Sequence, residues 1–149
     1  MLKREVLTNI LLEVLFGKSS DFYLELYEKG LINATFSKDC SLEPQFGFTA
    51  LGGESPNPEE VYDRVERHIA SVLRTGVDKS AVARARKVLL GKHIRLFNDV
   101  GRMGNEFVRN VLNDVNPFDV MDVEVTTEDV EERLREHFRG AAMAIVESA

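Results

Sequence analysis

The sequence has 149 residues, enough for one ordinary domain with a hydrophobic core of its own. It is 44% hydrophobic and 30% charged, as soluble globular proteins are, and has no apolar run long enough to cross a bilayer. The net charge of −6 argues against a nucleic-acid surface, which needs clustered Lys and Arg. These counts predict one domain, residues 1–149, that binds neither nucleic acid nor a membrane.

The first residues and the single cysteine indicate the compartment. Lys3 and Arg4 are followed by Glu5 and Glu13 instead of an uninterrupted apolar stretch and a cleavage site, so we expect no secretory signal. Cys40 is the only cysteine and cannot form an internal disulfide, which agrees with a reducing environment. We therefore expect a cytoplasmic protein.

The first fifty residues predict two helices followed by two strands. The helices, 3–16 and 22–30, have apolar residues three and four apart and each is closed by a glycine. The strands, 32–40 and 46–50, contain β-branched and aromatic residues. The second strand alternates with a period of two, so its two phenylalanines should share one face of a sheet.

The rest of the chain is predicted to be mainly helical. Two glycines and an Asn-Pro pair end the second strand and begin a helix. The predicted elements after this boundary are helices at 58–75, 79–98, 105–112 and 127–138, a helical turn at 117–121, and a last strand at 141–148. We expect this last strand, which is largely apolar, to be buried on both faces.

This order of elements predicts the α+β fold class, with helices packed on an antiparallel or mixed sheet. Three strands make a thin sheet for so many helices, whose apolar stripes need area to pack on. We therefore expect the chain to be part of a larger assembly.

No pattern of catalytic or metal-binding residues is present. His68, His93 and His137 are far apart, and none forms a two-histidine pair at helical spacing, so we interpret all three as structural. Cys40 has no base near it in sequence and is interpreted as unreactive. The glycines do not have the spacing of a phosphate-binding loop. We predict no catalytic residue and no metal ligand in this sequence.

Four segments together resemble the insulinase and pitrilysin type of zinc metallopeptidase, a family that includes the mitochondrial processing peptidase. The segments are FGKSSDFYLELYEKGLINATF (16–36), FGFTALGGESPNPEEVYDRVERHI (46–69), ARARKVLLGKHIRLFND (83–99) and TTEDVEERLREHF (126–138). Their order and spacing are similar to those of the family and cover nearly the whole chain. The resemblance favours the bacterial branch, which has two homologous domains per polypeptide.

The resemblance implies a non-catalytic role. The family's catalytic motif is an inverted His-x-x-Glu-His zinc helix, and this sequence has no match to it. The chain therefore resembles the C-terminal, non-catalytic domain, starting after additional strands that the family has. It is expected to form part of a peptide-holding chamber, without peptidase activity or a cofactor of its own, and zinc is expected only in the missing catalytic domain.

The resemblance also suggests two weak substrate-contact positions. In many family members an arginine and a tyrosine at the helix-to-strand junction reach the bound peptide. Here Tyr27 and Asn33 occupy those positions, with one residue fewer between them. Tyr27 has helical spacing with Tyr23, which favours a core position for its ring. Some family members work as pairs in which one subunit supplies the zinc. The expected partner is therefore a catalytic N-terminal domain or a paired subunit. A peptide substrate is expected to bind only together with that catalytic half.

Two other functions stay open at the level of sequence. The chain could be an independent protein-interaction module that pairs with itself or with a partner through uncovered sheet edges, giving a homo-oligomer. An enzyme of unrelated chemistry, built on Cys40 or a histidine, is the third alternative.

Overall fold

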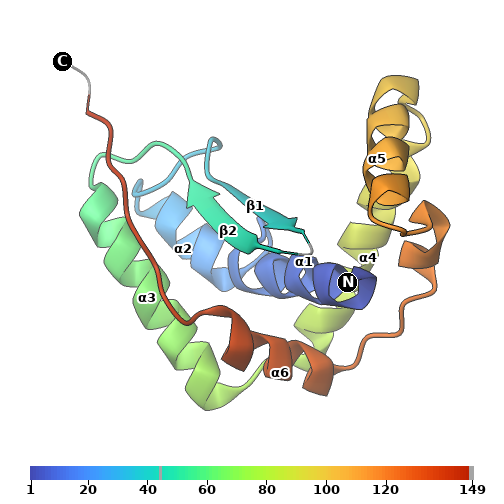
Figure 1. Ribbon diagram of the computed structural model, residues 1–149. Coiled ribbons are helices and arrows are strands. Elements are labelled where there is room, and N and C mark those ends of the chain that lie inside the picture. Colours follow the sequence, from blue (N-terminus) through green and yellow to red (C-terminus); the bar gives the residue numbers. More distant parts are fainter. Residues whose placement is uncertain (44, 148–149) are drawn as a thin grey trace.

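The computed structural model describes residues 1–43 and 45–147. Helices surround a short β-hairpin: α1 runs beneath it, while α3 and α5 stand on its two sides (Figure 1). The elements in chain order are α1 (Leu2–Phe16), α2 (Asp21–Glu28), β1 (Ser37–Leu42), β2 (Gly47–Gly52), α3 (Pro58–Thr75), α4 (Lys79–Leu96), α5 (Val100–Leu112), the 3-10 helix η1 (Pro117–Met121) and α6 (Thr127–His137). The α+β class is confirmed.

Helix α1 is the centre of the hydrophobic core. It contacts α2, α4, α6 and β1, and Ile10 and Leu11 have no exposed surface. Val82 of α4 and Val130 of α6 are buried in the same cluster. Fully burying a side chain of this size contributes about 1.5–3 kcal/mol, so the helices around α1 supply most of the fold's apolar stabilisation.

The junction after α2 is a turn and not the start of a strand. Gly30 has φ +68, a left-handed conformation that suits glycine, and the N–H of Leu31 bonds back to the carbonyl of Leu26 at 2.9 Å. The side-chain oxygen of Asn33 then accepts the N–H of Thr35 at 2.9 Å. This Asx turn uses the backbone donor that a ladder would need. The predicted strand 32–40 is therefore wrong in its first part, and β1 begins at Ser37.

The hairpin is antiparallel, with Cys40 opposite Thr49 and Ser41 opposite Phe48. Cys40 and Leu51 pack against the helical core. Because side chains alternate along a strand, Phe48 lies on the opposite face, and 54% of it is exposed. The more aromatic face of β2 therefore points away from the core.

Side-chain caps fix the starts of three helices. The side chains of Asn57, Asp78 and Thr126 each accept a backbone N–H from the first turn of α3, α4 and α6. Helix α5 begins earlier than the predicted residue 105, because Asp99 accepts the N–H of Arg102 at 3.0 Å. None of the helices in the described part of the chain is long and apolar enough to cross a membrane.

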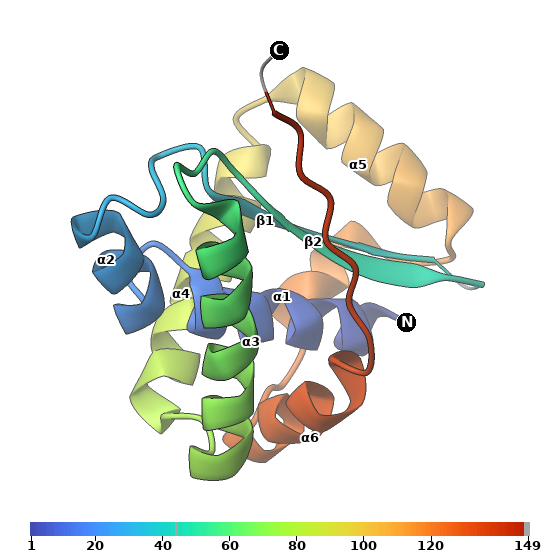
Figure 2. The same cartoon turned by 90° about the vertical axis from the view of Figure 1, so that its left-hand side faces the viewer.

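The prediction of a buried last strand is wrong for residues 141–147. This segment has no regular secondary structure, and Met143 and Val146 are exposed. It runs along α3 on the side of the hairpin in Figure 1 and crosses in front of β2 in Figure 2. A strand needs a neighbour to satisfy its backbone groups, and in the described residues this segment has no ladder with any other. Ser148 lies outside the described residues.

Candidate functional site

A groove of roughly 1200 Å³ lies along β2. One wall is β2, another is α3, and the third is the segment 140–145. Its apolar lining includes Phe48, Leu51, Val61, Val65, Ile69 and Ile145. Grooves with such a lining bind apolar side chains of a partner or ligand.

The hairpin next to the groove has open edges. The sheet of the described residues has two strands only, so each strand has one edge without a ladder partner. Such an edge presents unpaired backbone N–H and C=O groups that can pair with another extended chain. Backbone pairing and apolar contacts are therefore both available in one place.

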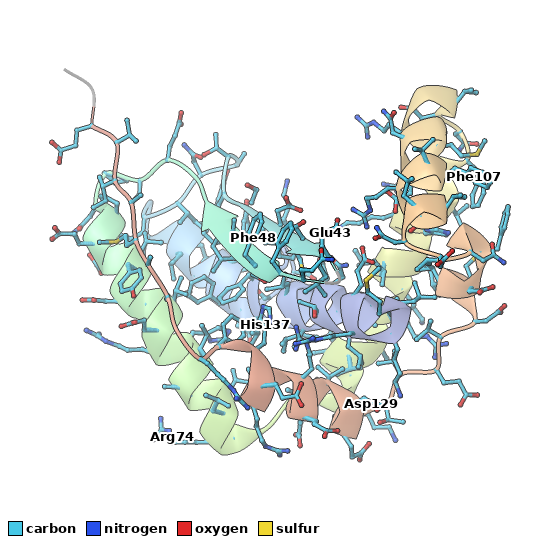
Figure 3. The ribbon with its side chains drawn as sticks, viewed as in Figure 1. Glu43, Phe48, Arg74, Phe107, Asp129 and His137 are labelled. Carbon is cyan, nitrogen blue, oxygen red and sulfur yellow. The ribbon has the colours of Figure 1, made fainter. Side chains whose placement is uncertain are left out.

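A hydrogen-bond chain lies beneath the hairpin and joins α1, α6 and β2. Arg133 Nε donates to Thr8 Oγ1 at 2.8 Å, and Arg133 Nη2 donates to His137 Nδ1 at 2.9 Å. His137 Nε2 lies 2.6 Å from Thr49 Oγ1. Because a guanidinium can only donate, Nδ1 must be an acceptor, and Nε2 therefore carries the proton and donates to Thr49. Figure 3 shows His137 below the hairpin and Phe48 above it.

The electrostatics keep this chain of side chains in one protonation state. Burial, together with the nearby cations Arg133 and Arg4, lowers the pKa of His137 to about 4. His137 is therefore neutral at pH 7. Burial raises the pKa of the Cys40 thiol, which a hydrogen bond from Thr49 only partly offsets. A protonated, half-buried thiol is a poor nucleophile, which agrees with the interpretation of Cys40 as unreactive.

The two substrate-contact positions do not lie at the groove. Tyr27 is 51% exposed, and its ring stacks on Tyr23 with centroids 5.9 Å apart. The expected core position is wrong for Tyr27, because Tyr23 takes the buried site and Tyr27 lies one turn later at the end of α2. Asn33 is exposed, and its Nδ2 donates to Glu54 Oε2 at 3.1 Å. A substrate role for Tyr27 and Asn33 stays a prediction.

The remaining histidines make packing contacts. His68 stacks on Phe22, with ring centroids 4.8 Å apart, and its Nε2 lies 3.1 Å from the carbonyl oxygen of Leu15. Burial lowers the pKa of His68. The ring of His93 meets Phe97 edge-on. Residues 1–43 and 45–147 contain no group of three or more His, Cys, Asp and Glu side chains that could hold a metal ion.

The Arg133 cluster was not predicted from the sequence. The sequence predicts only a structural role for its histidine, His137. The signal in the sequence is helical spacing. Arg133 follows Val130 by three residues and therefore lies on the apolar stripe that Val130 and Leu134 form. It precedes His137 by four residues, so the two side chains lie on the same face of the helix. A charged residue inside an apolar stripe needs partners, and that requirement could have drawn attention to this position.

Comparisons with known proteins agree with this geometry. Residues 2–89 match the model of the family described as peptidase M16 inactive domain. The chain is 36% identical to the uncharacterized zinc protease YmfH of Bacillus subtilis, covering 97% of this chain and 34% of that protein. It is similar to a crystal structure of an M16-like peptidase from Alicyclobacillus acidocaldarius, with a TM-score of 0.88 and 31% identity over 93% of this chain and 34% of that one.

The chain thus spans about a third of the length of these relatives. The family match covers more than half of the chain and includes α1, α2, the hairpin and α3, which form most of the core and two walls of the groove. The sequence and the fold both lead to the family that the motifs resembled. This chain belongs to the peptidase M16 inactive-domain family, as an insulinase-like C-terminal domain.

Proposed function

We propose that this chain is a non-catalytic C-terminal domain of an insulinase-like zinc metallopeptidase and forms part of the wall of its peptide-holding chamber. The observation that carries the proposal is the match to a domain described as inactive, in a sequence without the His-x-x-Glu-His motif. The zinc protease named among the relatives is three times as long, which leaves room for a catalytic domain outside this sequence. In this proposal the zinc belongs to that domain, and the chain itself has no cofactor and no peptidase activity.

The proposed partner is the catalytic N-terminal domain or a paired subunit. The apolar groove and the open edges of the hairpin support such a partner. Exposed apolar surface and unpaired backbone groups are stabilised when another chain covers them. Strands from the partner would extend the two-stranded sheet. We place the complex in the cytoplasm, and Tyr27 and Asn33 are the residues proposed to contact a peptide once the catalytic half is present.

The test combines metal analysis, a binding assay and a peptidase assay. The purified chain should contain no stoichiometric zinc and should hydrolyse no peptide, whereas mixing it with a His-x-x-Glu-His domain from the same genome should give a complex and peptidase activity. Phe48→Ser should weaken the complex, because it removes an exposed aromatic side chain from the groove. Leu24→Ser, at a similarly exposed position on α2, is the matched control. Zinc binding or hydrolysis by the chain alone would overturn the proposal.

The interaction module is the second candidate, favoured by the exposed Phe46 and Phe48 beside an open strand edge. It predicts a homo-oligomer in the isolated chain that Phe48→Ser dissociates, and no complex with any catalytic domain. Light scattering on the wild-type chain, measured with and without the catalytic domain, separates the two proposals.

A further inference from the structure

The hydrogen-bond chain of Thr8, Arg133, His137 and Thr49 lies where two walls of the groove meet. Thr49 belongs to β2, which is the first wall. His137 is the last residue of α6, and the segment that forms the opposite wall starts three residues later, at Gly140. The hydrogen bond between Thr49 and His137 therefore links one wall to the base of the other.

The link depends on a neutral imidazole. Arg133 is buried, with only 4% of its side chain exposed. Its Nη1 lies 3.6 Å from Oε2 of Glu136, with which it forms an ion pair. Its guanidinium satisfies its remaining N–H groups partly through Thr8 and His137. A proton on His137 Nδ1 would remove the acceptor for Arg133 Nη2 and place two cations in contact. The histidine ring must then move away, and its hydrogen bond to Thr49 is lost with it.

We propose that Thr8, Arg133, His137 and Thr49 form a proton-sensitive latch, which holds β2 against α6 while His137 is neutral and releases β2 when His137 is protonated. The latch sets the separation between β2 and the terminal segment, and so the width of the groove. It rests on the geometry of these four side chains and not on the identity of the partner. Its failure and that of the proposed function are thus measured separately.

The groups around His137 fix the direction of the response. Arg133 on its own helix and Arg4 on α1 both oppose a proton on the ring. Glu136 lies beside Arg133, Cys40 of β1 carries a protonated thiol, and Thr49 of β2 is uncharged. With the pKa of His137 at about 4, the latch is closed at pH 7 and opens only as the pH falls through about 4.

The experiment is a pH titration of the whole chain followed by nuclear magnetic resonance. The amide of Phe48 on β2 and the methyl group of Met143 on the terminal segment should shift together, with a midpoint near that of the His137 ring. Methyl groups of α4, such as Val82, should not move in the same range. Carboxylates also titrate in this pH range, so the variant His137→Gln is the decisive test. Its neutral side-chain amide should abolish the joint shift, whereas the control variant His68→Gln should preserve it.

A second variant tests the latch at neutral pH. Thr49→Val keeps the size of the side chain and removes the hydroxyl, so amide hydrogen exchange along β2 should accelerate about tenfold, as expected for the loss of one partly buried hydrogen bond. The exchange of α4 should stay unchanged. Three results would each overturn the latch. The joint shift could persist in His137→Gln, or the His137 ring could titrate without a shift at Phe48 and Met143. Amide exchange could also be unaltered in Thr49→Val.

Discussion

Glu13 provides the sharpest test of how the elements are held together. Its carboxylate oxygen Oε2 accepts from Lys38 Nζ at 2.7 Å and from Lys92 Nζ at 3.0 Å. The three residues come from α1, β1 and α4, and the side chains of Glu13 and Lys38 are only 12% and 17% exposed. One carboxylate thus joins the hairpin and a second helix to the central helix.

We predict that Glu13→Gln lowers the free energy of unfolding by about 2–3 kcal/mol. Removing one partner of a fully buried ion pair costs about 3–5 kcal/mol, because the other charge is left without compensation. Here Lys92 is 58% exposed and can turn into water, so only Lys38 is left near-buried and unpaired. For a domain of this size the loss corresponds to a decrease in Tm of about 5–10 °C.

The two lysines should respond differently. Lys92→Met should cost less than about 1 kcal/mol, because Glu13 still has Lys38 as a partner and the Lys92 side chain is itself 58% exposed. Lys38→Met should cost more, and combining it with Glu13→Gln should cost clearly less than the sum of the two single changes, because both remove the same interaction.

The pH dependence follows from the pKa of Glu13. Burial alone would raise this pKa, but hydrogen bonds from Lys38 and Lys92 outweigh burial and lower it below the usual 4.5. A carboxylate with a lowered pKa stabilises the fold above its unfolded-state pKa, and this stabilisation is lost as the pH falls through the folded value. The stability deficit of Glu13→Gln should therefore be largest at neutral pH and shrink in acid.

The measurement is guanidinium unfolding followed by far-UV circular dichroism, since the chain has no tryptophan. Wild type and the variants are compared at neutral pH and at several lower values. A Glu13→Gln deficit below about 0.5 kcal/mol at neutral pH, the size of an ordinary surface substitution, would refute the reasoning. So would a deficit that does not change with pH.

Two further predictions concern the helical core and the start of α6. Leu11→Ala, at a position without exposed surface, should destabilise the chain by about 2–5 kcal/mol in the same unfolding assay, whereas Leu24→Ala, at an exposed position, should change it by less than about 0.5 kcal/mol. Thr126→Ala removes one half of the capping box with Asp129 and should cost about 1 kcal/mol; the adjacent Thr127→Ala lacks this effect, and equal costs for the two would contradict the capping argument.

The helices were predictable because their signals are local. Asn57, Asp78 and Thr126 each bond to a backbone N–H within three residues, so the sequence around them contains the whole interaction. The α+β class and the family followed from the order of such segments. The predicted start of α5 at residue 105 is wrong. Asp99 provides a local capping signal of the same kind, and the helix begins directly after it.

The hairpin and the last segment depend on residues distant in sequence. The period of two in β2 shows that Phe48 and Thr49 lie on opposite faces, but not which face the helices cover. The apolar residues near Met143 have a strand pattern, but pairing requires a neighbour that the described residues do not provide. The Arg133 cluster likewise joins positions more than a hundred residues apart, such as Thr8 and Arg133. Long-range contacts of this kind leave little trace in a single sequence.

Helix α1 is buried on nearly all sides, because the other elements of the chain pack around it. A chain cut after Gly17 would still contain the sequence of every other helix and of the hairpin, but it would lack the buried side chains, Ile10 and Leu11 among them, on which those elements pack. The remainder is therefore expected to lose its fold, and a synthetic peptide of α1 is expected to restore that fold when added.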